Sequence, residues 1–183
     1  KRLLAQALNL SLSPGERLLV VGPSGAGKSS ILRVLAGLWQ LGAGAGSVHV
    51  SPGAFFLPQA PYMVLGGIRE QLAYPLLGES PSDDDARAAL VRVGLGHLAP
   101  LIGLDDRGAD WAETLSTGEK QRLAFARLLL HKPPLAIFDE ATSALDVENE
   151  RRMYELVADD VGTFVSVGHR DSLCQFHTIV LEL

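Results

Sequence analysis

The glycine-rich segment at residues 22–29, GPSGAGKS, constrains the fold and function of this chain more than any other feature. It follows the short apolar run Arg17–Val21, and apolar residues recur at helical spacing after Lys28 until Gly37 and the glycine-rich residues 42–46. A buried strand, a tight loop and a helix are the context in which the pattern G-x-x-x-x-G-K-[ST] binds phosphate. These flanks disfavour a glycine-rich turn without a ligand. The segment therefore predicts a binding site for a nucleoside triphosphate.

Backbone N–H groups of this loop and the positive end of the following helix are expected to surround the phosphates. Lys28 is expected to neutralise the β- and γ-phosphates, and the Ser29 hydroxyl is expected to bind Mg²⁺. The predicted phosphate contacts are Gly22, Pro23, Ser24, Gly25, Ala26, Gly27, Lys28, Ser29 and Ser30.

A second feature lies at residues 135–140, where an apolar run ends in Asp139 and Glu140. Sheets of the α/β class bind their ligands at the carboxyl ends of the strands. Asp139 is predicted to reach the Mg²⁺ shell, and Glu140 is predicted to orient or deprotonate an attacking water. Two acids at a strand end also occur as solvated turn residues, and the phosphate loop favours the functional interpretation. The pair predicts hydrolysis rather than binding alone.

The alternation of strand-like and helical patterns predicts a parallel α/β core. Helical patterns dominate between Gln59 and His131, which indicates a helical insert. Three aspartates follow Ser82, and a helix cap is favoured over a metal site because adjacent acids on one helical turn diverge. Further strands are expected at residues 47–50, 54–57, 135–138, 163–167 and 178–183, and further helices at residues 83–93, 116–130 and 146–158.

Composition limits the class of protein. With 183 residues, 47% of them hydrophobic, the chain suits one domain with a sizeable core. The net charge of −5 and the lack of a basic stripe argue against nucleic-acid binding. The lone cysteine, Cys174, is expected to be a small buried residue. No apolar run approaches the roughly 20 residues that cross a bilayer, so the chain itself is expected to be soluble.

A third motif, LSTGEKQR at residues 115–122, places Ser116 and Gly118 at the start of a predicted helix. Such a helix start is a second anion site in the same chain. The octet resembles the signature sequence of ABC transporter ATP-binding domains, although Thr117 and Glu119 stand where that family more often has Gly and Gln. The resemblance implies that Ser116 and Gly118 contact the γ-phosphate of an ATP held by the phosphate loop of a second subunit.

Further elements resemble this family, in the family's own order. Gln59 resembles the Q-loop glutamine, and Asp146 ends a segment similar to the D-loop. His169 resembles the switch histidine, which contacts the γ-phosphate and holds the catalytic geometry with Glu140. The resemblance implies ATP and Mg²⁺ as ligands, with Ser29, Gln59 and Asp139 around the metal and Glu140, His169 and Gln59 as catalytic residues. A lone histidine after a strand is more often structural, so His49, His97, His131 and His177 receive no role.

Several short segments are similar to the peroxisomal-type ABC half-transporters and their bacterial relatives, namely residues 37–39, 59–63, 68–75, 111 and 124–133. This resemblance implies a membrane domain N-terminal on the same full-length chain and a head-to-tail dimer, with a homodimer favoured. It also implies a place on the cytoplasmic face of a membrane, either the bacterial inner membrane or an organelle membrane such as the peroxisome. The substrate cannot be inferred from it.

The sequence thus predicts one ABC ATP-binding domain over residues 1–183. Residues 1–58 and 132–183 are assigned to the ATP-binding core, a P-loop NTPase fold, and residues 59–131 to a helical signature subdomain. In this family an aromatic residue that stacks on adenine normally lies upstream of the phosphate loop, but no aromatic residue precedes Gly22 in this sequence. The stacking residue and the N-terminal strands are expected to lie before Lys1.

Three other classes of protein are alternatives to this prediction. A GTPase or small-molecule kinase is disfavoured because neither Asn9 nor Asn149 lies in a guanine-reading N-K-x-D context. The second class is a soluble ABC ATPase for DNA repair or translation. The repair type would insert a long coiled coil between the phosphate loop and the signature, whereas Lys28 and Ser116 are only 88 positions apart here. The acidic balance and the lack of heptads agree with a transporter domain. A nucleotide-binding regulatory cassette with little or no turnover is disfavoured by Glu140 and His169 and stays open because of Thr117.

Overall fold

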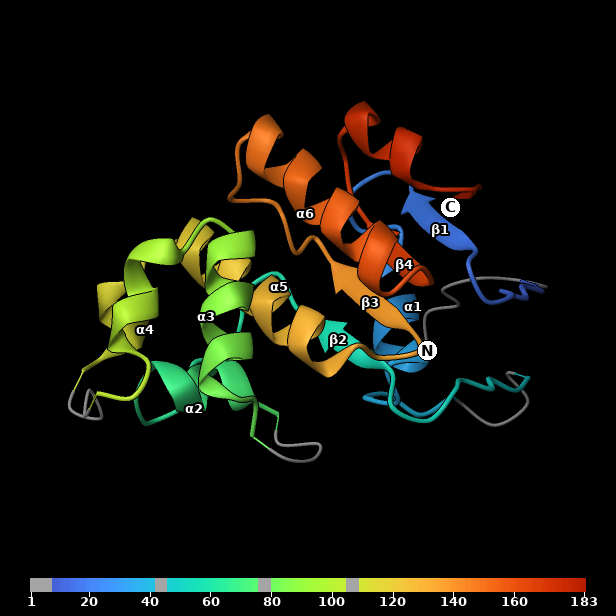
Figure 1. Ribbon diagram of the computed structural model, residues 1–183. Coiled ribbons are helices and arrows are strands. Elements are labelled where there is room, and N and C mark those ends of the chain that lie inside the picture. Colours follow the sequence, from blue (N-terminus) through green and yellow to red (C-terminus); the bar gives the residue numbers. More distant parts are fainter. Residues whose placement is uncertain (1–7, 42–45, 76–79, 105–108) are drawn as a thin grey trace. The chain divides into compact units, whose positions relative to one another are not determined.

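The computed structural model describes residues 8–41, 46–75, 80–104 and 109–183 (Figure 1). Residues 1–7 and the glycine-rich residues 42–45 are among those that lie outside this description. The contacts divide the chain into two compact units, which are the described residues of Lys1–Pro58, Pro133–Glu140 and Val161–Leu183, and those of Gln59–Lys132 and Ala141–Asp160.

The first unit is built on a parallel sheet with the strand order β2-β3-β4-β1-β5. Every neighbouring pair of strands is parallel. The strands are β1 (Arg17–Val21), β2 (Phe55–Leu57), β3 (Ala136–Asp139), β4 (Phe164–Val167) and β5 (Ile179–Glu182). All four residues of β3 and of β4 are buried, as is typical of parallel sheets. The prediction of an α/β fold with a mainly parallel sheet is confirmed.

Helix α1 (Lys28–Leu35) packs against this sheet through Leu32. The core cluster comprises Leu18, Val20, Leu32, Ile137, Val165 and Val167. The helix ends as predicted before Gly37, which has a φ of 71°. The N–H of Leu38 donates to the carbonyl of Arg33 at 2.8 Å. A left-handed glycine followed by such a bond is a common way for a helix to end.

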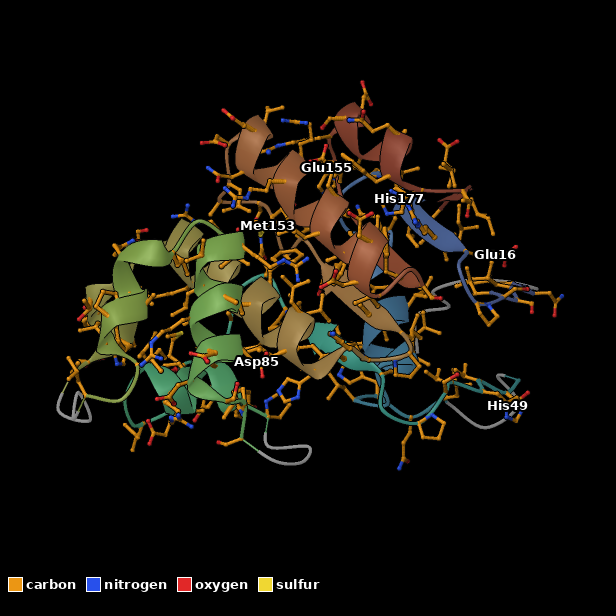
Figure 2. The ribbon with its side chains drawn as sticks, in the orientation of Figure 1. Glu16, His49, Asp85, Met153, Glu155 and His177 are labelled. Atoms are coloured by element: carbon orange, nitrogen blue, oxygen red, sulfur yellow. The ribbon has the colours of Figure 1, made fainter. Side chains whose placement is uncertain are left out.

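His177, labelled in Figure 2, joins the 3₁₀ helix η2 (Asp171–Phe176) to the sheet. Its Nδ1 donates to the carbonyl of Leu173 at 2.7 Å, and its Nε2 lies 2.9 Å from the Ser166 hydroxyl. The ring meets Phe164 edge-on, with 5.2 Å between the centroids. Burial lowers the pKa of His177 and so favours the neutral imidazole. These contacts fix the segment that follows β4.

The second unit is helical. Its elements are α2 (Ile68–Ala73), α3 (Asp83–Arg92), the 3₁₀ helix η1 (Gly96–Leu101), α4 (Trp111–Thr114), α5 (Thr117–His131) and α6 (Val147–Asp160). Helix α5 contacts α2, α3 and α6. Ser82 caps α3 by accepting the N–H of Asp85 at 3.1 Å, which confirms the predicted cap (Asp85 in Figure 2). None of the helices within the described ranges combines the length and apolar character that a membrane span requires.

A buried arginine on α5 organises the start of this unit. Arg127 is 3% exposed, and its guanidinium donates to the carbonyls of Gln71 at 2.6 Å and Tyr62 at 2.7 Å. It also lies over the ring of Tyr74, 5.4 Å from the centroid. Burial lowers the pKa of Arg127 to about 10, which leaves the side chain charged near neutrality. The segment around α2 is thereby held against α5.

Two expectations about the fold are wrong. Residues 47–50 form no strand, because only Val50 of this run is partly buried and Val48 is 41% exposed. An alternating apolar pattern does not make a strand unless a neighbouring strand pairs with its backbone groups. Cys174 is exposed rather than buried. It lies in η2, where Leu173 is the residue that turns into the core.

One ion pair of the second unit should be visible in the pH dependence of stability. Arg92 donates two hydrogen bonds to Asp160, at 2.6 and 2.9 Å, and this bonding is the main cause that lowers the pKa of Asp160. A carboxylate with a lowered pKa stabilises the fold above its unfolded pKa, and that stability is lost as the pH falls through its folded pKa. Arg92→Met should therefore lower the Tm by about 2–4 °C near pH 7.

The difference in Tm between Arg92→Met and the native protein should disappear as the pH falls below the ordinary pKa of aspartate, about 4. The measurement is thermal unfolding followed by circular dichroism at several pH values. Arg151→Met is the matched control, because Arg151 pairs with Glu155 on the exposed face of α6. If Arg92→Met lowered the Tm by the same amount at every pH, the prediction would be wrong.

Candidate functional site

The loop between β1 and α1 turns on glycines with positive φ. The φ values are 140° for Gly22, 80° for Gly25 and 107° for Gly27. The N–H of Ala26 donates to the carbonyl of Pro23 at 3.2 Å and closes the turn. Helix α1 begins directly after Gly27 and has no side-chain cap. An uncapped helix start beside a tight glycine loop is a favourable place for an anion.

Lys28 carries a charge into this loop. Lys28 is 6% exposed, and its Nζ donates to the carbonyls of Gly22 at 2.8 Å and Pro23 at 3.1 Å. Two carbonyl dipoles therefore hold the ammonium against the turn. Of the other predicted contacts, Ser24 lies exposed at the loop tip and Ser30 lies partly buried in the first turn of α1.

Ser29 and Asp139 lie together although they are far apart in the chain. The Ser29 hydroxyl donates to Oδ1 of Asp139 at 2.6 Å. Asp139 is 6% exposed, and the guanidinium of Arg33 lies 4.0 Å from its Oδ2. A hydroxyl and a carboxylate are hard oxygen ligands of the kind that Mg²⁺ selects. The two side chains therefore fit the predicted metal.

Glu140 and His169 form a second pair at the same edge. Nε2 of His169 lies 3.0 Å from Oε1 of Glu140. Glu140 has a φ of 51°, uncommon for a residue other than glycine, and its N–H donates to the carbonyl of Val167 at 3.2 Å. The side chains are 26% and 48% exposed, so both can meet water.

Parallel pairing explains why these groups meet. The phosphate loop follows β1, Asp139 and Glu140 lie at the end of β3, and His169 follows β4. Strands β3, β4 and β1 are neighbours and run in the same direction, as the arrows of β1 and β3 in Figure 1 show. Their carboxyl ends therefore share one edge of the sheet, where α/β proteins bind ligands.

A comparison of two glycines tests the loop geometry. An added Cβ at Gly22 would lie 2.7 Å from the carbonyl oxygen of Leu183, whereas at Gly25 it would meet nothing within 4 Å. Both residues have positive φ. Gly25→Ala should therefore cost about 1 kcal/mol of unfolding free energy and Gly22→Ala about 3 kcal/mol or more, because only the latter forces backbone atoms apart. Denaturant unfolding measures both, and equal losses would contradict the prediction.

In the second unit, Ser116 caps α5 together with Glu119. The Ser116 oxygen accepts the N–H of Glu119 at 3.3 Å, and Oε2 of Glu119 accepts the Ser116 hydroxyl at 2.7 Å and its N–H at 3.0 Å. The bond from the hydroxyl is the main cause that lowers the pKa of Glu119. Thr117 is exposed as the first residue of α5. This helix start is thus a capped, rigid one.

Gly118 and Asp146 belong to the same unit. A Cβ at Gly118 would lie 3.2 Å from the carbonyl oxygen of Ala144, so a glycine permits this close approach. Asp146 accepts the backbone N–H of Asn149 at 2.8 Å and its side-chain amide at 3.0 Å. The bond from the backbone is the main cause that lowers the pKa of Asp146.

Gln59 is exposed, and its carbonyl accepts a hydrogen bond from Gln121 at 3.0 Å. The sequence alone predicts no role for Gln121, whereas the structure buries its side chain, with the residue 1% exposed. The burial of Gln121 could have been predicted from its spacing, because it lies three and four positions before Ala124 and Phe125, which are buried on the same helix.

The predicted site residues are divided between the two units. The first unit contains Lys28, Ser29, Asp139, Glu140 and His169, and the second contains Gln59, Ser116, Gly118 and Asp146.

The chain resembles known proteins in both sequence and fold. The family described as ABC transporter matches residues 5–143 of the chain. An uncharacterized ABC transporter ATP-binding protein of Synechocystis is 47% identical over 182 residues, which are 100% of this chain and 28% of that protein. The human lysosomal cobalamin transporter is 45% identical over 192 residues, covering 98% of this chain and 31% of that protein.

A solved structure agrees with them. A bacterial Atm1-family ABC exporter with ATP bound superposes with a TM-score of 0.74 at 31% identity, covering 93% of this chain and 33% of that chain. The chain thus spans about a third or less of the length of these proteins. Its sequence matches the ATP-binding part of these relatives, some of which are of the peroxisomal type. Its fold matches the ATP-binding part of the exporter. The chain belongs to the ABC transporter family, as an ATP-binding domain.

Proposed function

We propose that this chain hydrolyses ATP and that the hydrolysis drives transport across a membrane by a longer protein. The contact between Glu140 and His169, at 3.0 Å, carries the proposal. It lies on the edge of the sheet that also bears the phosphate loop and the Ser29 and Asp139 pair. A binding module needs the loop alone, whereas a carboxylate with an orienting imidazole is what water activation requires.

The proposed roles follow from the chemistry of each side chain. The backbone N–H groups of residues 22–30, except Pro23, which has none, and the ammonium of Lys28 bind the phosphates. Ser29, Asp139 and Gln59 hold Mg²⁺, which when bound neutralises charge on the phosphate oxygens. Glu140 orients the water and accepts its proton.

His169 has two partners in this proposal. Its imidazole contacts the γ-phosphate and keeps Glu140 in place, so that the base and the phosphate are held in one geometry. The 3.0 Å separation from Glu140 supports this role. The exposed fraction of the histidine, 48%, leaves it accessible to a nucleotide.

The proposed assembly is a head-to-tail dimer with two-fold symmetry. Ser116, Gly118 and Asp146 act across it, on the nucleotide of the second subunit. Binding of ATP closes the dimer and hydrolysis reopens it. A membrane domain, N-terminal on the same longer protein, converts this cycle into transport, and the chain lies on the cytoplasmic face of that membrane. Residues 1–183 form one ATP-binding domain, with residues 59–131 as its signature subdomain and residues 1–58 and 132–183 as its core, although the contacts group Ala141–Asp160 with the helical unit.

The test is steady-state phosphate release by the full-length protein that contains this chain, in membranes, with ATP and Mg²⁺. We expect phosphate release that requires both. Binding of ATP is measured in parallel by equilibrium dialysis. Normal ATP binding without phosphate release would contradict the proposal and would instead support a regulatory cassette, with Thr117 as the first residue to replace by glycine.

A further inference from the structure

A buried glutamine on α5 connects segments that carry four of the proposed site residues, which are Gln59, Ser116, Gly118 and Asp146. Gln121 is the fifth residue of α5 and is 1% exposed. A side-chain amide removed from water is destabilising unless its donors and its acceptor are paired. Here the amide nitrogen donates to the carbonyl of Gln59 at 3.0 Å and to the hydroxyl of Ser143 at 3.2 Å, and the amide oxygen accepts the N–H of Ala144 at 3.0 Å.

These bonds reach across the sequence. Gln59 lies 62 positions from Gln121, and Ser143 and Ala144 lie 22 and 23 positions from it. The bond to Gln59 is made to its backbone, so it fixes where this residue sits without occupying its side chain. The bonds to Ser143 and Ala144 fix the segment that leads directly into Asp146.

The start of α5 is itself rigid. Its first turn is closed by the reciprocal bonds of Ser116 and Glu119. Gly118 packs against the carbonyl of Ala144, so this turn meets the 143–146 segment at a second point. A displacement of Ser116 therefore has to move Gln121, and Gln121 is bonded to the backbone of Gln59.

We propose that Gln121 is a positioning residue that makes the start of α5, the backbone of Gln59 and the segment at residues 143–146 move as one body. Closure of Ser116 and Gly118 on the nucleotide of the second subunit then carries with it the backbone of Gln59, whose side chain is proposed above to bind the metal and the attacking water. Gln121 itself touches neither. This inference rests on the proposed function.

Another buried glutamine of the same unit provides a matched control. Gln71 is 0% exposed, and its amide bonds to both backbone groups of Val64, at 2.6 and 3.1 Å. It also accepts from Arg127 at 3.2 Å. These partners carry no proposed site residue. Replacing Gln71 removes a comparable set of buried hydrogen bonds without disconnecting Gln59 from α5.

The experiment compares Gln121→Met with Gln71→Met in the full-length protein, since methionine keeps the length of the side chain and removes the amide. Four quantities are measured: kcat and KM for ATP, the Kd for ATP, and the Tm. In Gln121→Met we expect kcat to fall about tenfold while the Kd for ATP stays within about twofold. In Gln71→Met we expect a comparable loss of Tm with kcat within about twofold of native.

A kcat of Gln121→Met equal to native, or kcat losses in both variants that follow their losses of Tm, would overturn the inference. If Gln121→Met does not fold, Ser143→Ala removes one of the three bonds, and we expect kcat to fall about threefold. A native kcat in Ser143→Ala would then overturn the inference. Native protein that releases no phosphate contradicts the proposed function, whereas native turnover that Gln121→Met or Ser143→Ala leaves unchanged contradicts this inference alone.

Discussion

Replacing Glu140 by glutamine is expected to lower the rate of phosphate release from ATP by about 10²–10⁴-fold, the usual effect of removing a general base. Glutamine keeps the size of the side chain and a hydrogen-bond partner for His169, which lies 3.0 Å from Oε1 of Glu140. It loses the basic oxygen that accepts the proton from water. The phosphate loop and the Ser29 and Asp139 pair are untouched, so ATP should bind with native affinity.

Two readouts make this prediction specific. Phosphate release is measured at saturating ATP and Mg²⁺, and ATP-dependent dimerisation is measured by cross-linking of the full-length protein. We expect the first to be lost and the second to persist, because closure needs binding and reopening needs hydrolysis. Glu155→Gln is the matched control, because Glu155 lies on α6 (Figure 2) and pairs with Arg151 at 2.9 Å. Native turnover by Glu140→Gln would remove Glu140 from the role of base.

The parts of the fold that follow from local pattern were predicted from the sequence. The strand, loop and helix around Lys28 are contiguous, and the cap of Ser82 on α3 spans three residues. The meeting of Ser29 with Asp139, 110 positions apart, was predictable for a different reason. Ser29 lies just after the loop that follows β1, and Asp139 is the last residue of β3. Parallel strands of one sheet align their carboxyl ends.

Other features depend on partners that no local pattern reveals. Residues 47–50 alternate like a strand, but strand formation is decided by what pairs with the backbone. Cys174 has the composition of a core residue, and its exposure is decided by the direction in which η2 turns Leu173. The bonds of Gln121 are made to residues 22 to 62 positions away, and a lone glutamine in a helix is ordinarily exposed. Long-range polar contacts of this kind are set by the tertiary fold and not by the local sequence.

Replacing Lys28 by methionine is expected to weaken ATP binding by about 10- to 100-fold, the range that corresponds to one or two lost charge-assisted hydrogen bonds. Methionine fills the space of the buried lysine stem and removes the ammonium. That ammonium now donates to the carbonyls of Gly22 and Pro23, at 2.8 and 3.1 Å. A carbonyl is a weaker partner than a phosphate oxygen, so the charge is available to a nucleotide at little cost.

The control for this variant is Lys120→Met, which removes a partly buried lysine from the helical unit and leaves the loop unchanged. Binding is measured by equilibrium dialysis at more than one salt concentration. We expect the native protein to lose affinity with salt more steeply than Lys28→Met, because the variant lacks one of the charges that salt screens. Equal affinities of the native protein and Lys28→Met would mean that the loop amides and the start of α1 bind the phosphates without the lysine. The buried ammonium would then serve to hold the turn, through Gly22 and Pro23, rather than to bind the nucleotide.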